Sequence, residues 1–518
     1  MWTTRAETAP EGSYHYACNM IPMEPRRADS YLTQRPTVTR YAVGSTTGTV
    51  VAMGSLSKVD GTVVSWVLTT AGLWQITAGS ESSLVSAANL SSKSAVVGSP
   101  VTYWCVYNNT VIFNPHDGVN KPWSWDGSAG AGGVTLLSAA PLAYGRPTVY
   151  YRKLFFIAWS FRDSIYWSEE DAAGTGYNGT GYTNFWALTQ SGTAPLYVLY
   201  GTNEALYYFR QSSIGAIRGA ANPDFKTSGV HDSISQSVGS IALAGVQGVD
   251  NDLWFVDQFG VPNILRAGGQ PHPLIFEVSA SSLQASEPFG FDDAMWNRST
   301  STVVATNEVF AVPALATIPY RTVWFNVRSE TTDQRAFLVC DAEAGRPLAW
   351  FVPYTGVALA RCVALIQDTA SLRIYPMLVA SASGTVFLFG DTQSGGDQTT
   401  DATVQTTTWR VIGAPLGTTD YVEYQFDRLD LVGAASGTTE TIKTQLLTSY
   451  KDSSASVSTA QTPVIGTSDS LDRIAVGCGE TGRWTRPVFT VQSTALAKLV
   501  LASWTVTAFP LTPIPSGP

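Results

Sequence analysis

The chain has 518 residues, of which 44% are hydrophobic and 14% are charged, and its formal net charge is −9 at pH 7. This composition excludes a disordered chain and is typical of a packed globular protein long enough for more than one domain. The acidic balance excludes a basic surface that would hold nucleic acid by neutralising its phosphates. Because Gly, Ser and Thr rather than Lys and Glu fill most polar positions, we expect an almost all-β chain.

Residues 1–40 are interpreted as an N-terminal arm. They hold four prolines and show neither strand alternation nor helical periodicity. The arm could lie over the surface, complete part of the following domain or dock on a partner, and the sequence leaves these alternatives open. Residues 1–10 lack the apolar centre of a secretion signal, and no apolar run approaches the roughly 20 residues that span a bilayer. We therefore expect synthesis and folding in a cytoplasm.

Residues 41–395 carry a recurring pattern of aromatic strands. Eight short apolar runs start 27 to 56 residues apart, and each is entered from another extended run through a brief polar turn. The step of 27 residues is too short for a whole unit, so the sixth and seventh runs share one unit and about seven units remain. Such recurrence predicts a β-propeller, in which each blade buries its faces against its neighbours. The runs are residues 73–77, 111–114, 154–159, 206–210, 253–257, 309–313, 336–340 and 386–390.

The hairpins inside these units have a local physical basis. Asn108 and Asn109 separate two β-branched and aromatic runs, residues 102–107 and 110–114. Asn tolerates the positive φ that a two-residue hairpin turn requires. We therefore expect a tight hairpin at this pair.

The pattern changes after residue 395. Residues 391–401 are polar and Gly-rich, which is typical of a linker or an exposed loop. Residues 421–431 alternate strictly and then shift phase at Asp427 and Arg428, where we expect a β-bulge. Extended runs continue to residue 509 and are sufficient for a small β-sandwich. The expected fold is all-β: an arm (1–40), a β-propeller of about seven blades (41–395), a linker (396–401) and a C-terminal β-sandwich (402–518).

No residue spacing supports a catalytic, cofactor or metal site. The five cysteines are scattered without a CxxC pair, and the four histidines lack the spacing of metal ligands. A GxGxxG match at residues 174–179 lacks the strand and helix that a dinucleotide site needs. We predict no catalytic residue, no metal ligand and no cofactor, and we predict that the chain is not an enzyme.

Two stretches resemble a known family. Residues 194–225 (APLYVLYGTNEALYYFRQSSIGAIRGAANPDF) and 250–260 (DNDLWFVDQFG) look like the propeller-type tail nozzle proteins of short-tailed bacteriophages, also called tail hub or packaged-DNA stabilisation proteins. Residues 476–491 are similar to the Gly-rich turn with Arg and Trp that precedes the last strands of many such proteins. The resemblance spans most of residues 40–510 and involves no catalytic motif.

The resemblance implies a virion structural protein that assembles in the bacterial host cytoplasm and resides in the virion tail. Its subunits would form a ring, a homohexamer, below the portal and adaptor, which retains packaged DNA and conducts it at ejection. The implied partners are further copies of the chain, the adaptor–portal complex, and tail fibres or spikes. DNA would pass without specific binding, because an acidic wall repels phosphates. The alternatives are a glycan- or receptor-binding propeller of the lectin kind and a glycan-cleaving enzyme, which would need two carboxylates across a pocket.

Two long loops are candidates for a gate that narrows the channel of such a ring. Residues 171–184 and 391–401 both exceed what a hairpin needs, and each could project inward or lie outside. The candidate gate residues are Asp171, Tyr177, Tyr182, Asn184, Asp391 and Asp397.

Overall fold

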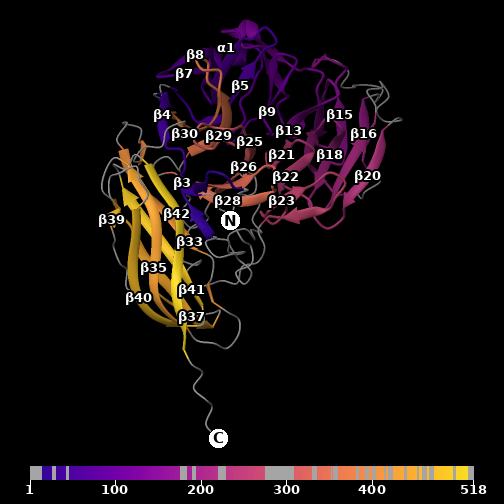
Figure 1. Cartoon of the computed structure of the whole chain (residues 1–518). Coiled ribbons are helices and arrows are strands. Elements are labelled where there is room, and N and C mark those ends of the chain that lie inside the picture. The colour runs from indigo at the N-terminus through magenta and orange to yellow at the C-terminus, as the bar shows by residue number, and fades with distance from the viewer. Residues whose placement is uncertain are drawn as a thin grey trace.

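The computed structural model confirms the all-β fold, with a propeller followed by a C-terminal sandwich (Figure 1). No helix in its described part has the length and apolar character that a membrane crossing needs. The structure describes residues 14–25, 31–42, 46–174, 184–188, 194–219, 229–274, 308–328, 335–351, 353, 360–380, 384–390, 396–398, 404–413, 416–417, 424–436, 440–451, 454–457, 464–465, 472–482, 484–493 and 498–511.

Seven four-stranded antiparallel units, numbered here as blades 1 to 7, follow one another in the described part of the chain. The first strands of successive blades lie side by side around a central axis, and blade 7 returns to blade 1. A short helix, α1 (Ala87–Ser92), follows blade 1, and a single 3₁₀ turn, η2 (Ala131–Gly133), lies between the last two strands of blade 2. The strands are β5 (Val50–Ser57), β6 (Val63–Thr69), β7 (Gly72–Thr77) and β8 (Ser80–Ser86) in blade 1; β9 (Tyr103–Tyr107), β10 (Thr110–Asn114), β11 (Trp123–Trp125) and β12 (Val134–Leu136) in blade 2; β13 (Ala143–Tyr150), β14 (Lys153–Ala158), β15 (Ser164–Trp167) and β16 (Phe185–Ala187) in blade 3; β17 (Leu196–Gly201), β18 (Ala205–Arg210), β19 (Ile214–Arg218) and β20 (Val230–Ser235) in blade 4; β21 (Val246–Val249), β22 (Asp252–Val256), β23 (Pro262–Leu265) and β24 (Pro271–Pro273) in blade 5; β25 (Val309–Val312), β26 (Thr322–Arg328), β27 (Arg335–Asp341) and β28 (Arg346–Phe351) in blade 6; and β29 (Ala360–Gln367), β30 (Ile374–Ala380), β31 (Val386–Phe389) and β4 (Val38–Ala42) in blade 7.

The blades agree with the predicted spacing. The short step between the sixth and seventh apolar runs arises because they form β25 and β27, the first and third strands of the same blade. Asn108 and Asn109 join β9 to β10 with φ values of 45° and 59°, as a two-residue hairpin turn requires. Both predictions are confirmed.

Large aromatic side chains fill the space between neighbouring blades. The ring of Trp66 in blade 1 meets Trp104 and Phe113 of blade 2 edge-on, each at a centroid distance of 5.0 Å. Gly54 on β5 leaves the room for these indoles. A Cβ at that position would lie 2.5 Å from Cζ2 of Trp104 and 2.7 Å from Cζ2 of Trp66. The blade 1–blade 2 contact therefore depends on the missing side chain.

Replacing Gly54 with alanine is expected to lower the free energy of unfolding by about 1–3 kcal/mol, because two packed indoles must move. Urea unfolding monitored by tryptophan fluorescence measures this as a lower midpoint with an unchanged slope. Gly132→Ala is the matched control, since nothing lies within 4 Å of the added Cβ. If the two variants unfold at the same urea midpoint, Trp66 and Trp104 do not pack against Gly54 in solution as described.

The N-terminal arm is built into both domains. Its strand β4 pairs antiparallel with β31 and completes blade 7 as the outermost strand, with Val38 opposite Phe389 and Ala42 opposite Val386. The preceding strands β1 (Tyr14–Cys18), β2 (Met20–Pro22) and β3 (Leu32–Gln34) join the sheets of the sandwich. Of the three alternatives for the arm, the described part thus completes a blade, and it also extends the second domain.

The C-terminal sandwich consists of two sheets that face each other across a hydrophobic core. The rings of Phe489 on one sheet and Trp504 on the other are 5.4 Å apart. Both ladders of β35 shift register between Phe426 and Arg428, which confirms the predicted bulge. One sheet runs β1, β33 (Val404–Gly413), β41 (Trp484–Ser493), β37 (Lys443–Lys451) and β38 (Ser454–Val457), with β32 (Gly396–Gln398) beside β33 and β34 (Leu416–Gly417) beside β41; the other runs β2, β3, β42 (Lys498–Pro510), β35 (Tyr424–Ser436) and β40 (Asp472–Gly482); β36 (Glu440–Thr441) and β39 (Val464–Ile465) form a separate pair.

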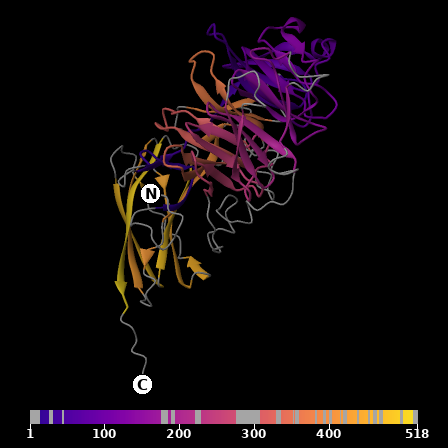
Figure 2. The ribbon, with the colours of Figure 1, turned by 90° about the vertical axis from the view of Figure 1, so that its right-hand side faces the viewer.

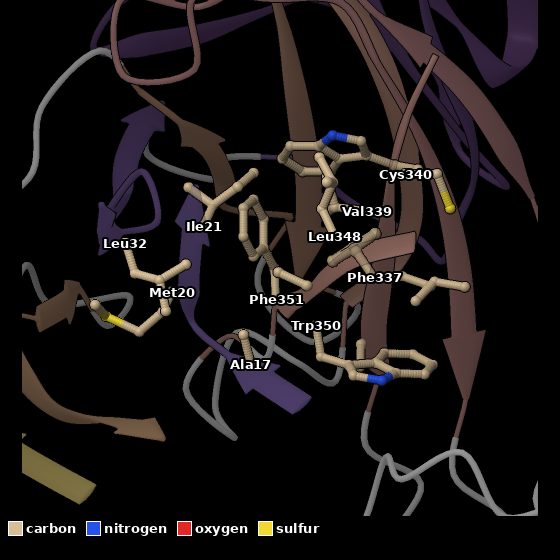
Figure 3. Packing of buried hydrophobic residues seen from close by; sticks show 14 of the residues in the cluster. Ala17, Met20, Ile21, Leu32, Phe337, Val339, Cys340, Leu348, Trp350 and Phe351 are labelled. Carbon is tan, nitrogen blue, oxygen red and sulfur yellow. The ribbon is translucent and has the colours of Figure 1, made fainter. Parts of the chain in front are cut away.

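Strand β1 joins the propeller and the sandwich in one continuous sheet. It pairs in parallel with β28 of blade 6 at Cys18 and Trp350, and antiparallel with β33 of the sandwich. Buried side chains of the arm, including Met20 and Ile21, lie in the same hydrophobic cluster as Trp350 and Phe351 (Figure 3). The chain is therefore one elongated body, with the propeller at one end and the sandwich at the other (Figure 2).

Candidate functional site

A cavity of about 190 Å³ lies at the central axis of the propeller. It is formed by first strands of six blades and by the connections that precede β9, β21 and β25. A DNA duplex, whose major groove alone is about 12 Å wide, cannot pass through it. The lining residues are Val51, Ala52, Met53, Pro100, Val101, Thr102, Tyr103, Trp104, Arg146, Ala244, Gln247, Glu308, Val309, Phe310, Val363, Ala364 and Leu365.

The polar residues that line this mostly apolar cavity are Arg146, Gln247 and Glu308, from three blades, and the hydroxyl-bearing Thr102 and Tyr103. Arg146 comes from β13, Gln247 from β21, and Glu308 from the residue before β25. Asn326 donates a hydrogen bond of 3.1 Å from Nδ2 to Oε2 of Glu308, which holds the carboxylate in place. Gln247 donates from Nε2 to Oη of Tyr200 at 3.1 Å. The described lining residues thus include one guanidinium, one side-chain amide, one carboxylate and two hydroxyl groups.

An aromatic cluster adjoins the cavity at Tyr103. The ring of His116 lies 5.1 Å from that of Tyr103, 4.7 Å from Tyr144 and 5.1 Å from Trp159. Arg162 stacks on the Tyr144 ring, with its guanidinium carbon 3.7 Å from the ring centroid. The Gly145 amide donates to Nδ1 of His116 at 2.9 Å, so the proton of the neutral imidazole resides on Nε2.

Burial of the imidazole, and secondarily the charge of Arg162, lower the pKa of His116 to about 4, against a smaller opposing effect of Asp117. An unfolded histidine titrates near pH 6.5, so between these two values the unfolded chain binds more protons than the folded one. Folding stability is therefore present above pH 6.5 and decreases as the pH falls towards 4.

The wild-type protein is expected to lose about 1–2 kcal/mol more stability between pH 7 and pH 4 than the His116→Asn variant, after allowance for the partial solvent exposure of the ring. Asparagine keeps an acceptor for the Gly145 amide but does not titrate, which makes it the matched control. Urea unfolding across this pH range measures the difference. If the stability of both proteins changes equally with pH, the pKa of His116 is not lowered in the folded protein.

The predicted gate residues do not meet at the cavity. Asp171 pairs with Arg152, which follows the far end of β13, and its amide donates to the Arg152 carbonyl at 2.9 Å. Asn184 is buried and donates from Nδ2 to Oε1 of Glu169 at 3.2 Å. Both residues pack onto blade 3 at the propeller face opposite the cavity. Tyr177, Tyr182 and Asp391 lie outside the described residues, as does the GxGxxG match in all but its first residue.

Asp397 differs most from expectation. Residues 396–398, assigned to a linker, form strand β32, and the Asp397 carboxylate is buried against Arg35 at an Oδ2–Nη2 distance of 2.5 Å. The prediction that Asp397 belongs to an exposed gate loop is wrong, because its carboxylate is enclosed in a junction between arm, propeller and sandwich. In the described part of the chain, no group of three or more His, Cys, Asp or Glu side chains could hold a metal ion.

Sequence reasoning did not find Arg146, Gln247 and Glu308 as residues of the cavity. The one local signal is Arg146, the single charged residue inside a first strand (AYGRPTVY). Gln247 and Glu308 carry no such signal: Gln247 is an uncharged residue within a short strand, and Glu308 follows two other polar residues, Thr306 and Asn307.

The fold and the cavity define the described part of this chain as a seven-bladed propeller with a C-terminal β-sandwich. No protein-family model matches the sequence. No curated protein matches it either.

Several solved structures match this chain, each with a low TM-score. The computationally designed Ika8 protein matches with a TM-score of 0.36 and 12% identity over 67% of this chain and 98% of its own. A glycoside hydrolase family 43 arabinoxylan arabinofuranohydrolase from Bacillus subtilis matches with a TM-score of 0.25 and 10% identity over 97% of this chain and 98% of its own. A further glycoside hydrolase matches with a TM-score of 0.22 and 10% identity over 96% and 99%, respectively.

Two of these structures are enzymes, which contradicts the prediction that the chain is not an enzyme, and that prediction is withdrawn. With TM-scores of 0.25 and 0.22 at 10% identity, these two matches assign no reaction to this chain.

Proposed function

We propose that this chain is a subunit of the tail nozzle of a short-tailed bacteriophage, where several copies form a tube that retains the packaged DNA and conducts it at ejection. The observation that carries the proposal is the continuous sheet through β28, β1 and β33, which joins the propeller to the sandwich. A tube that holds DNA under pressure needs subunits whose domains do not move apart.

Two further properties support this role. The axial cavity of a single propeller is too small for DNA, so a conduit requires a ring of several copies around a shared axis. The net charge of −9 disfavours adhesion of phosphates to such a tube. The resemblance of residues 194–225 and 250–260 to tail nozzle proteins implies a homohexamer docked below the adaptor and portal.

Quantitative mass spectrometry of gradient-purified particles tests the proposal. We expect this chain at a fixed ratio of about one copy per two portal subunits, as a six-membered ring on a twelve-membered portal gives. Electron microscopy of the same particles should place the propeller at the distal end of the tail. Absence of the chain from the particles would overturn the proposal.

A further inference from the structure

We infer that the axial cavity is a binding site for a small hydroxylated carboxylate, of which a hexuronate, an acidic monosaccharide, is the representative ligand. The inference does not depend on the nozzle proposal, because it follows from the side chains that line the cavity.

Arg146 would bind the carboxylate of this ligand. Arg146 lines the cavity and is half-buried, and none of the ion pairs among the described residues includes it. A guanidinium offers a planar pair of donors that matches a carboxylate in two parallel hydrogen bonds. Binding of an anionic ligand is therefore favoured by its electrostatic attraction to this half-buried cation.

Whereas Arg146 favours an anionic group on the ligand, Glu308 favours hydrogen-bond donors. Its carboxylate lines the same cavity and keeps its orientation through Asn326. A ligand must therefore present donors, such as hydroxyl groups, to Glu308 while its anionic group meets Arg146. A phosphate ester carries more negative charge and would be repelled by Glu308, whereas a metal cation would be repelled by Arg146. The pair selects a singly charged ligand with hydroxyl groups.

The size and the walls of the cavity restrict the ligand further. Its volume of about 190 Å³ lies below the roughly 300–1,000 Å³ of sites for drug-sized molecules, so a single ring is the appropriate size. Tyr103, Trp104 and Phe310 supply apolar ring surfaces against which the C–H face of a sugar can pack. Burial raises the pKa of Tyr103, so its phenol stays neutral and adds no second negative charge.

The connection that forms one wall is held in place before any ligand arrives. The Gly98 amide donates to Oγ1 of Thr102 at 3.0 Å, and the Thr102 amide donates to the Val51 carbonyl at 3.3 Å. These bonds tie the segment before β9 to β5 of the neighbouring blade. A preformed cavity avoids the ordering cost that weakens the binding of small ligands.

Isothermal titration of the full-length chain with glucuronate, glucose and glucose 6-phosphate tests the inference. We expect glucuronate to bind at least about tenfold more tightly than either of the other two sugars, as one charge-assisted hydrogen-bond pair provides. Arg146→Gln should reduce the glucuronate affinity to that of glucose. Glu308→Gln should reduce the preference for glucuronate over glucose 6-phosphate. Arg152→Gln, on the opposite face, is the matched control and should bind like the wild type.

Equal affinities of the wild-type protein for glucuronate and glucose would overturn the inference, as would a lack of glucuronate binding at its highest soluble concentration. So would an Arg146→Gln protein that binds glucuronate like the wild type. The comparison of the three sugars uses the wild-type protein, so it can still overturn the inference if a cavity variant fails to fold. Unfolding curves of each variant identify such a failure.

Discussion

Deletion of residues 1–42 is expected to abolish folding of the chain, whereas deletion of residues 1–13 is expected to leave a folded protein. The longer deletion removes the outermost strand of blade 7 and three strands of the sandwich. It also removes the buried side chains of Met20, Ile21, Leu32 and Val38. Burial of four such side chains stabilises by about 6–12 kcal/mol, comparable with the whole stability of a typical domain. Residues 1–13 lie outside the described residues, and the shorter deletion serves as the comparison.

Size-exclusion chromatography and circular dichroism of the two deletion proteins check this result. The 1–13 deletion should elute as the intact chain does and unfold cooperatively. The 1–42 deletion should aggregate or lack a cooperative transition, because β31 then presents an unpaired, apolar edge. A 1–42 deletion with the intact chain's unfolding transition would show that the arm does not close the propeller.

Asp397→Ala is expected to lower the free energy of unfolding by about 3–5 kcal/mol, because Arg35 would lose its buried counter-charge. The two side chains are only 2% and 1% exposed, and their closest atoms are 2.5 Å apart. Arg35 also donates from Nε to Oδ1 of Asn19 at 2.7 Å, and the Val38 amide donates to Oδ1 of Asp397 at 3.0 Å. The pair thus ties the arm and blade 7 to the strand that leads into the sandwich.

A double-mutant cycle separates this pair from its surroundings. Arg35→Met and Asp397→Leu should each be destabilising like Asp397→Ala. The double variant Arg35→Met/Asp397→Leu, which closes the cycle, should recover much of the loss, since an apolar pair needs no counter-charge. Arg152→Ala provides the exposed control and should change stability by less than about 1 kcal/mol. A coupling energy below about 1 kcal/mol between Arg35 and Asp397 would contradict their described burial.

The propeller could be predicted because its signals are local. The paired strands within a blade are neighbours in sequence, so the apolar runs, and turns such as Asn108-Asn109, define them without knowledge of distant residues. The same holds for the bulge at Asp427, where the alternation of one strand shifts phase. Even the assignment of two apolar runs to blade 6 required only their spacing.

The arm could not be predicted because its partners are distant. Ala42 pairs with Val386 and Cys18 with Arg410, and strands of three residues such as Met20–Pro22 are too short to show a period. Asp397 lies in a polar, Gly-rich stretch, which in isolation is typical of a linker. Its burial arises only when Arg35 is brought to it from the other end of the chain.

The axial cavity escapes sequence analysis for a similar reason. Arg146, Gln247 and Glu308 come from three separate blades that are distant in sequence. Their convergence follows from closure of the ring, which sets the angle between blades. By contrast, the candidate gate loop of residues 171–184 is conspicuous in the sequence for its length, but its ends, Asp171 and Asn184, lie on the opposite face.

The pairing of β4 with β31 also sets the order of events on the ribosome. Strand β4 finds its partner β31 only after residue 386 of 518, and β1 finds its first partner strand, β28, only after residue 350. Until then the apolar residues near the N-terminus have nowhere to pack, while the middle blades can already stack. The earliest part of the chain is therefore the last to be placed, and a nascent polypeptide must be protected from aggregation for most of its translation.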